Sequence, residues 1–214
     1  MKDFKLTKDW LKSFLLMLVS VILMGFSVSL LVLTKMGTDP CSSMNYGVSA
    51  LLGMSFGNYQ LLFNGVLLIL VILCKPSLIG TGTLGNMIVV GYTADFFSWV
   101  WTHVCHIPAD LSLTVRFGIL IPALVVFVFA AACYMQSGRG MAPYDALPFI
   151  LTEKLEKVTG KEGLFAIVRP LMDLTATIIG FATGGEVGIM TILMIITLGP
   201  TISWVGKLFQ KKQQ

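Results

Sequence analysis

Long runs of apolar residues, almost free of charge, are the feature that most constrains this chain. Runs of about 20 apolar residues can cross the hydrocarbon core of a bilayer as helices. With 56% hydrophobic and 12% charged residues, a soluble fold of this chain would lack a polar surface. The sequence therefore predicts an all-α polytopic membrane protein of about six transmembrane helices. The six runs are Ser13–Leu33, Tyr59–Leu73, Leu84–Trp101, Phe117–Met135, Leu164–Phe181 and Val187–Val205.

Two further stretches, Pro40–Met54 and Pro143–Val158, look helical but are too short or too polar to cross a membrane. Each follows a Gly-x-x-Pro turn. Glycine permits a sharp reversal of the chain, and proline suits the first turn of a helix. We expect each stretch to be a short re-entrant or interfacial helix that begins at its proline.

The Gly-x-x-Pro turn is part of an internal repeat, because Gly37-Thr-Asp-Pro recurs as Gly140-Met-Ala-Pro, 103 residues later. The same spacing lays Gly82-Thr-Leu-Gly over Gly185-Glu-Val-Gly. Three spans per half is an odd number, so the second half would begin on the opposite side of the bilayer. The repeat predicts one membrane domain over residues 1–214, built as two inverted repeats at 9–106 and 110–209. A duplication that serves folding alone is the alternative.

Lysine and arginine are unevenly distributed between the two sides that this topology defines. Twelve fall on the side of the N-terminus, and only Lys35 and Arg116 fall on the other side. Cytoplasmic loops of membrane proteins carry the excess of basic residues. We therefore expect both termini in the cytoplasm. The net charge of +4 follows from the same lysines, so nucleic acid is not an expected partner.

Ionisable residues inside the fifth run are candidates for a binding site, since a charge at a helix centre costs about 2.5 to 3.5 kcal/mol on insertion scales. Arg169 and Asp173 share one helix face at i, i+4 spacing. Arg169 either binds an anionic group, with Asp173 as counter-charge or protonatable residue, or forms a neutral pair with Asp173 and extends to the cytoplasmic surface. Asn64 falls near the equivalent place in the first half.

The two helix starts and the glycine-rich turns supply further candidates. Helix N-termini attract anions, so the starts near Asp39 and Asp145 predict a solute site, unless these carboxylates only cap their own helices. Thr83 and Glu186 enter the last run of each half beside glycines. Those glycines either let the backbone approach a ligand or permit tight helix packing.

Catalytic and cofactor chemistry has no support in the sequence. The four cysteines are widely spaced, with no Cys-x-x-Cys, and no Ser-His, His-Glu-x-x-His or paired-aspartate arrangement occurs. No nucleotide-binding motif occurs either, so transport energy would come from a gradient or a separate ATPase subunit. We expect no enzyme activity, no cofactor and no metal site.

Several ordered motifs resemble the YczE/YitT group of bacterial membrane proteins, and YczE in particular. They include Met36-Gly-Thr-Asp-Pro, Val90-Gly-Tyr-Thr-Ala-Asp-Phe-Phe, Gly138-Arg-Gly-Met-Ala-Pro-Tyr-Asp, Val168-Arg-Pro-Leu-Met-Asp and Gly184-Gly-Glu-Val-Gly-Ile-Met-Thr. The resemblance implies a multi-pass protein of the bacterial inner (plasma) membrane without an established substrate, and some members are linked to secondary-metabolite production. This chain departs from the group in having Asp173 where Glu is frequent, and in inserting Pro170.

Together these observations predict a small secondary transporter or permease for a small polar or anionic solute, bound between the inverted repeats. The substrate-binding candidates are Arg169, Asp173, Asn64, Asp39, Asp145, Thr83 and Glu186. The alternative is a membrane regulator or assembly factor that transports nothing. The lipid bilayer is the other expected partner, and a homo-oligomer or a partner membrane protein is left open.

Overall fold

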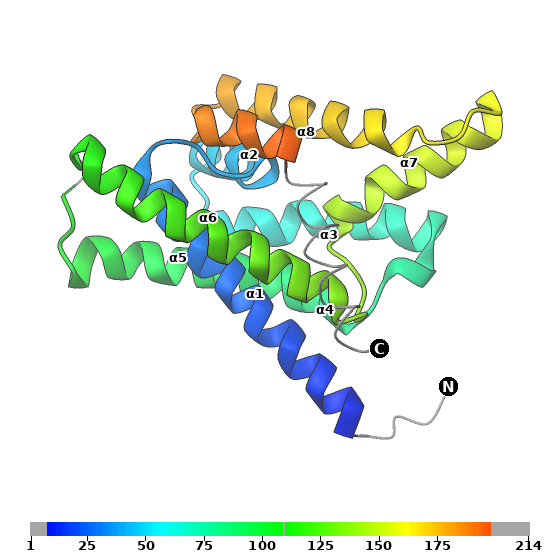
Figure 1. Ribbon diagram of the computed structural model, residues 1–214, viewed down its shortest axis with the longest axis horizontal. Coiled ribbons are helices and arrows are strands. Elements are labelled where there is room, and N and C mark those ends of the chain that lie inside the picture. Colours follow the sequence, from blue (N-terminus) through cyan, green and yellow to red (C-terminus); the bar gives the residue numbers. More distant parts are fainter. Residues whose placement is uncertain (1–7, 109, 198–214) are drawn as a thin grey trace.

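The computed structural model describes residues 8–108 and 110–197, and all regular structure within them is helical (Figure 1). Four of the described helices, α1, α3, α6 and α8, are long and apolar enough to cross a membrane. The elements are α1 (Lys8–Thr34), α2 (Pro40–Leu51), α3 (Phe56–Cys74), η1 (Pro76–Leu78), α4 (Thr81–Gly85), η2 (Asn86–Val90), α5 (Gly91–Trp99), η3 (Val100–Val104), α6 (Leu113–Gln136), α7 (Pro143–Thr159) and α8 (Phe165–Ala182).

The third and sixth expected spans differ in form from these four helices. Residues 81–104 make one uninterrupted helical segment, in which η2 and η3 are π-helical turns between α-helical pieces. A further helix occupies residues 189–197, and the rest of the expected span Val187–Val205 lies outside the described residues. The two short helices begin at Pro40 and Pro143, as the sequence predicts.

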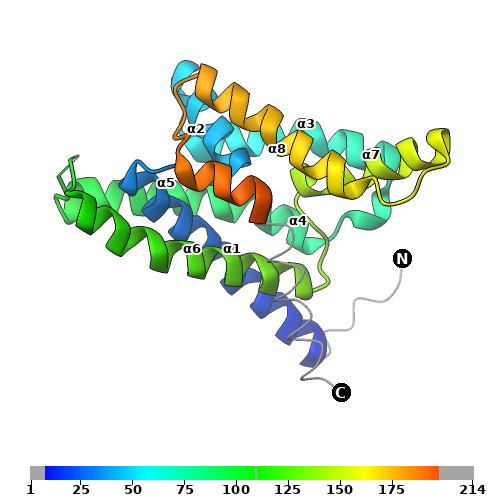
Figure 2. The ribbon, with the colours of Figure 1, turned by 45° about the horizontal axis from the view of Figure 1, so that its top comes forward.

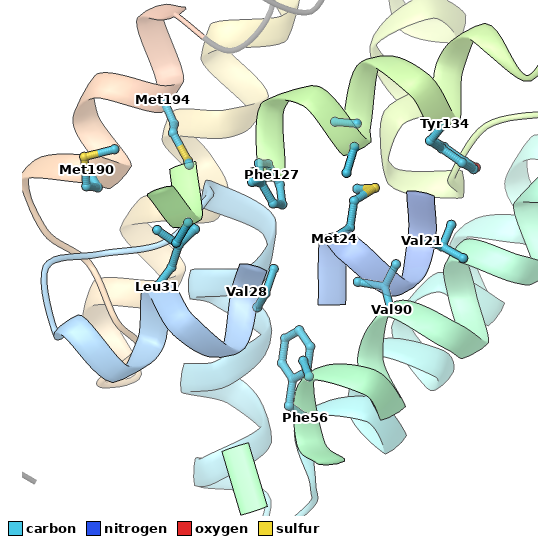
Figure 3. Close-up of a cluster of buried hydrophobic side chains, with 14 of the residues drawn as sticks. Val21, Met24, Val28, Leu31, Phe56, Val90, Phe127, Tyr134, Met190 and Met194 are labelled. Carbon is cyan, nitrogen blue, oxygen red and sulfur yellow. The ribbon is translucent and has the colours of Figure 1, made fainter. Parts of the chain in front are cut away.

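The main hydrophobic core forms where α1 packs against α6 (Figure 3). The buried positions of both helices alternate in steps of three and four residues, which is the spacing of helices that pack nearly parallel or antiparallel over a long seam. On α1 they are Met17, Val21, Met24, Val28 and Leu31, and on α6 they are Leu120, Ala123, Phe127, Ala130 and Tyr134. Met17, Met24 and Leu31 precede Leu120, Phe127 and Tyr134 by 103 residues, the same interval as the Gly-x-x-Pro turns.

Contacts at the two ends of this seam show that α1 and α6 run antiparallel. Lys35, after the end of α1, pairs with Asp110, before the start of α6, at 3.4 Å. At the other end Arg139 donates to Ser13 Oγ at 2.9 Å and to the carbonyl oxygen of Trp10 at 2.8 Å, and its guanidinium lies 4.7 Å from the Trp10 ring.

A second group of helices consists of α2, α7 and α8, which in both views lie on the side of the molecule opposite α1, α5 and α6 (Figures 1 and 2). Glycines allow α2 and α8 to approach closely, since a Cβ on Gly180 would lie 3.0 Å from the backbone nitrogen of Met44. α3 packs against α7 through Val71, Ala146 and Ile150. Hydrogen bonds from Lys75 and Lys157 lower the pKa of Glu153, beside that contact, to about 2.

Each Gly-x-x-Pro turn contacts the other half of the chain, at the start of its last helix. The nitrogen of Met190 donates to the carbonyl oxygen of Met36 at 3.1 Å, and that of Gly82 donates to the carbonyl oxygen of Arg139 at 2.6 Å. Gly37 lies against Gly188, and Gly140 lies against Gly80. We call these contacts the Gly37–Gly188 and Gly80–Gly140 junctions.

The junctions correct the alignment of the two halves expected from the sequence. Gly80 N donates to Thr83 Oγ1 at 3.0 Å, and Gly188 N donates to Thr191 Oγ1 at 3.2 Å. Thr83 therefore corresponds to Thr191, and the expected match of Thr83 with Glu186 is wrong. Several closely spaced glycines in both segments make more than one alignment fit the sequence.

Candidate functional site

A cavity of about 170 Å³ lies between the two groups of helices. Its volume would hold about five water molecules or one small solute. Residues of α1 and α6 line one side of it, and the starts of α2 and α7 both reach it with parts of α3, η2 and α8. Its polar lining residues are Asp39, Ser42, Gln60, Asn64, Asn86, Tyr134, Tyr144, Asp145, Arg169 and Asp173.

Arg169 is the centre of a hydrogen-bonded ion-pair network in this cavity. Its Nε donates to Asp173 Oδ2 at 2.9 Å, and its Nη1 donates to Asp145 Oδ1 at 2.8 Å. Tyr144 donates to Asp173 Oδ1 at 2.9 Å, and its ring lies 5.6 Å from the guanidinium carbon. The Arg169 side chain is only 18% exposed. Arg169 is therefore mostly buried, and two carboxylates face its single positive charge.

The start of α2 contributes a third carboxylate to the cavity. Asp39 caps the helix through Oδ1, which accepts a hydrogen bond from Ser42 N at 3.0 Å. Its other oxygen, Oδ2, is buried and has no hydrogen-bond partner among the described residues, and the same is true of Asn64 Oδ1. Buried acceptors without partners are rare in native proteins, and an unseen solvent molecule or ligand is a common cause.

The structure brings five of the seven predicted site residues to this cavity, namely Arg169, Asp173, Asn64, Asp39 and Asp145. Thr83 and Glu186 do not line it. Thr83 is fully buried at the Gly80–Gly140 junction, and the carbonyl oxygen of Glu186 accepts from Thr38 N at 3.1 Å at the other junction. Burial raises the pKa of the Glu186 carboxyl, and nearby Lys35 and Arg116 oppose this rise.

Sequence reasoning missed Tyr144, Gln60 and Asn86 as lining residues. Gln60 precedes Asn64 by one helical turn, and its carbonyl oxygen accepts from Asn64 Nδ2 at 3.0 Å, so helical spacing was an available signal. Asn86 lies in the π-helical turn η2, and such turns frequently mark functional sites. The sequence alone gives no sign of that turn.

The part of the chain that matches a known protein family contains every residue that lines the cavity. A family model described as a family of unknown function, DUF6198, matches residues 11–207. The chain belongs to this family. No solved structure matches the chain significantly.

Three relatives extend the comparison beyond the family description. The chain is 27% identical over 180 residues to the uncharacterized membrane protein YczE of Bacillus subtilis, a match that covers 84% of this chain and 78% of YczE. It is 24% identical to the uncharacterized protein YyaS of the same organism, over 83% of this chain and 84% of YyaS. An uncharacterized protein of Haemophilus influenzae is 22% identical, over 90% of this chain and 83% of the relative. The resemblance to YczE is confirmed, and with the apolar helices it identifies a membrane protein.

Proposed function

We propose that this DUF6198 protein is a small secondary transporter that moves a small polar solute through the central cavity. One observation carries the proposal: the two Gly-x-x-Pro helix starts and the Arg169 network line the same cavity. Transporters commonly place binding sites where interrupted helices from two repeats meet. The proposal includes no catalytic step and no cofactor.

We further propose that six membrane spans form two inverted repeats. The equivalent hydrogen bonds at the Gly37–Gly188 and Gly80–Gly140 junctions support it, and so does the antiparallel pairing of α1 with α6. Two halves with opposite orientation give a site that either side of the membrane could reach in turn.

Native cysteines test the proposed orientation in the inner membrane. Cys74, at the end of α3, and Cys105, after η3, are both exposed. With cytoplasmic termini, a membrane-impermeant maleimide should label a Cys105-only variant in intact cells and a Cys74-only variant only after the membrane is opened. The reverse pattern would invert the orientation, and labelling of both variants in intact cells would contradict the topology.

Cysteine labelling also tests whether the cavity is open to water, as a transporter requires. Cys41 lines the cavity, whereas Cys133 is buried and does not line it. We expect methanethiosulfonate ethylammonium to modify a Cys41-only variant faster than a Cys133-only variant, because the reagent must approach the sulfur atom through water.

Solute movement is then measured as charge displacement on a solid-supported membrane that carries proteoliposomes. Pools of small amines, amino acids, carboxylates and sugars supply the substrates. We expect a current with one pool that Cys41 modification abolishes and that Asp9→Asn, a change at an exposed position, leaves intact. An unreactive Cys41 together with no current from any pool would refute transport and favour the membrane regulator or assembly factor.

A further inference from the structure

The charges that line the cavity define the class of solute. Asp39, Asp145 and Asp173 are three carboxylates, and Arg169 is the single cation among the described lining residues. When the carboxyl groups are ionised, two negative charges remain. The N-termini of α2 and α7 each contribute about half a positive charge, so about one negative charge is left uncompensated. A monocation complements this cavity, and an anion does not.

Two unpartnered atoms on residues that line the cavity support the same conclusion. Asp39 and Asn64 are 7% and 3% exposed, and the atoms without partners on them are Oδ2 and Oδ1. When Asp39 is ionised, both atoms accept hydrogen bonds and cannot donate them. A bound solute therefore has to supply hydrogen-bond donors. A carboxylate or phosphate would bring only more acceptors to these two atoms.

Metal ions that require three carboxylate, imidazole or thiolate ligands fit the cavity less well than an organic cation does. Within residues 8–108 and 110–197, no group of three His, Cys, Asp or Glu side chains is placed to hold a metal ion. An ammonium group needs no such cage, because its three N–H donors bind separate acceptors. The cavity of about 170 Å³ admits a solute of about six non-hydrogen atoms.

We propose that the cavity binds a small solute carrying one ammonium group, which donates to Asp39 Oδ2, while a second donor on the same solute reaches Asn64 Oδ1. This inference rests on the proposed function, since it names the class of molecule transported. Arg169 then acts as a positioning residue, because it fixes the Asp145 and Asp173 carboxylates and does not receive the solute itself.

Three probes of nearly equal size separate charge from shape: ethanolammonium, ethylene glycol and glycolate. Binding to the purified full-length protein is measured by isothermal titration calorimetry at constant ionic strength. We expect ethanolammonium to bind and glycolate not to bind. Asp39→Asn should weaken ethanolammonium binding by about tenfold or more, because it removes a charge-assisted hydrogen bond while asparagine still caps α2.

Two further variants test the second acceptor and provide a control. Asn64→Leu should also weaken binding, and Asp9→Asn, whose side chain is exposed, should not change it. Binding of glycolate in preference to ethanolammonium, an unchanged affinity in a folded Asp39→Asn variant, or no binding of any probe would overturn the proposal.

Failure of the inference is distinguishable from failure of the proposed function. If ethanolammonium binds in this way but proteoliposomes accumulate no solute, the transport function fails and the ammonium site stands. If proteoliposomes transport another solute and ethanolammonium does not bind, only the inference fails.

Discussion

Arg169→Met is expected to lower the free energy of unfolding by about 3 to 5 kcal/mol, the cost of removing one partner from a buried ion pair. The substitution leaves Asp173, which is 2% exposed, and Asp145 without the cation that both contact. Methionine fills similar space, so lost packing contributes little. The midpoint of unfolding in mixed dodecylmaltoside and sodium dodecyl sulfate micelles provides the measurement.

A double-mutant cycle identifies the ion pair as the source of this loss. Asp173→Asn retains an acceptor for the Tyr144 hydroxyl and removes the charge, so Arg169→Met combined with Asp173→Asn should be less destabilised than the sum of the two, by about 0.5 to 3 kcal/mol. Arg116→Met is the matched control outside the cavity. Additive effects would show that Arg169 and Asp173 do not act as a pair.

Gly80→Ala and Gly188→Ala are each expected to destabilise the protein by about 3 kcal/mol, or to prevent its folding, because overpacking against backbone cannot be relieved by a rotamer change. A Cβ on Gly80 would meet the carbonyl oxygen of Arg139, and a Cβ on Gly188 would meet that of Met36. Both variants should also lose solute-dependent current where they fold. Fluorescence-detected size-exclusion chromatography after graded heating measures the stability.

Two glycines within helices, away from the junctions, provide controls. A Cβ on Gly65 in α3 or on Gly118 in α6 would meet no atom within 4 Å. Alanine there should be neutral or stabilising by up to about 1 kcal/mol, since it reduces the conformational freedom of the unfolded chain. Equal losses in all four variants would mean that the junctions contribute nothing specific.

Local signals explain how much of the fold could be predicted from the sequence. Pro40 and Pro143 fix their helix starts within a few residues, because glycine and proline act on the adjacent backbone. The alignment that matches Gly80 in the first half with Gly188 in the second depends instead on contacts between segments far apart in the chain. The π-helical turns in 81–104 are likewise set by packing and leave no mark in apolar periodicity.

In the candidate site, too, contacts within one helix could be predicted from the sequence, and contacts between helices could not. The spacing of Arg169 and Asp173 predicts their pairing, because both belong to one helix. Asp145 and Tyr144 reach them from α7, which only the tertiary fold places there. An arginine with one known partner suggested an anion site. The second carboxylate reverses that interpretation, since it uses the charge on which an anion would depend.

The Gly37–Gly188 junction can form only late in synthesis of the chain. Gly37 leaves the ribosome about 150 residues before Gly188, the residue it packs against. At roughly 5 to 20 residues per second, that interval is about 8 to 30 s. Throughout it, the carbonyl oxygen of Met36 lacks its eventual donor, Met190. The first half therefore stays incomplete until the helix that begins at residue 189 has been synthesised. In any chain truncated before that helix, the first Gly-x-x-Pro turn lacks its hydrogen bond from Met190.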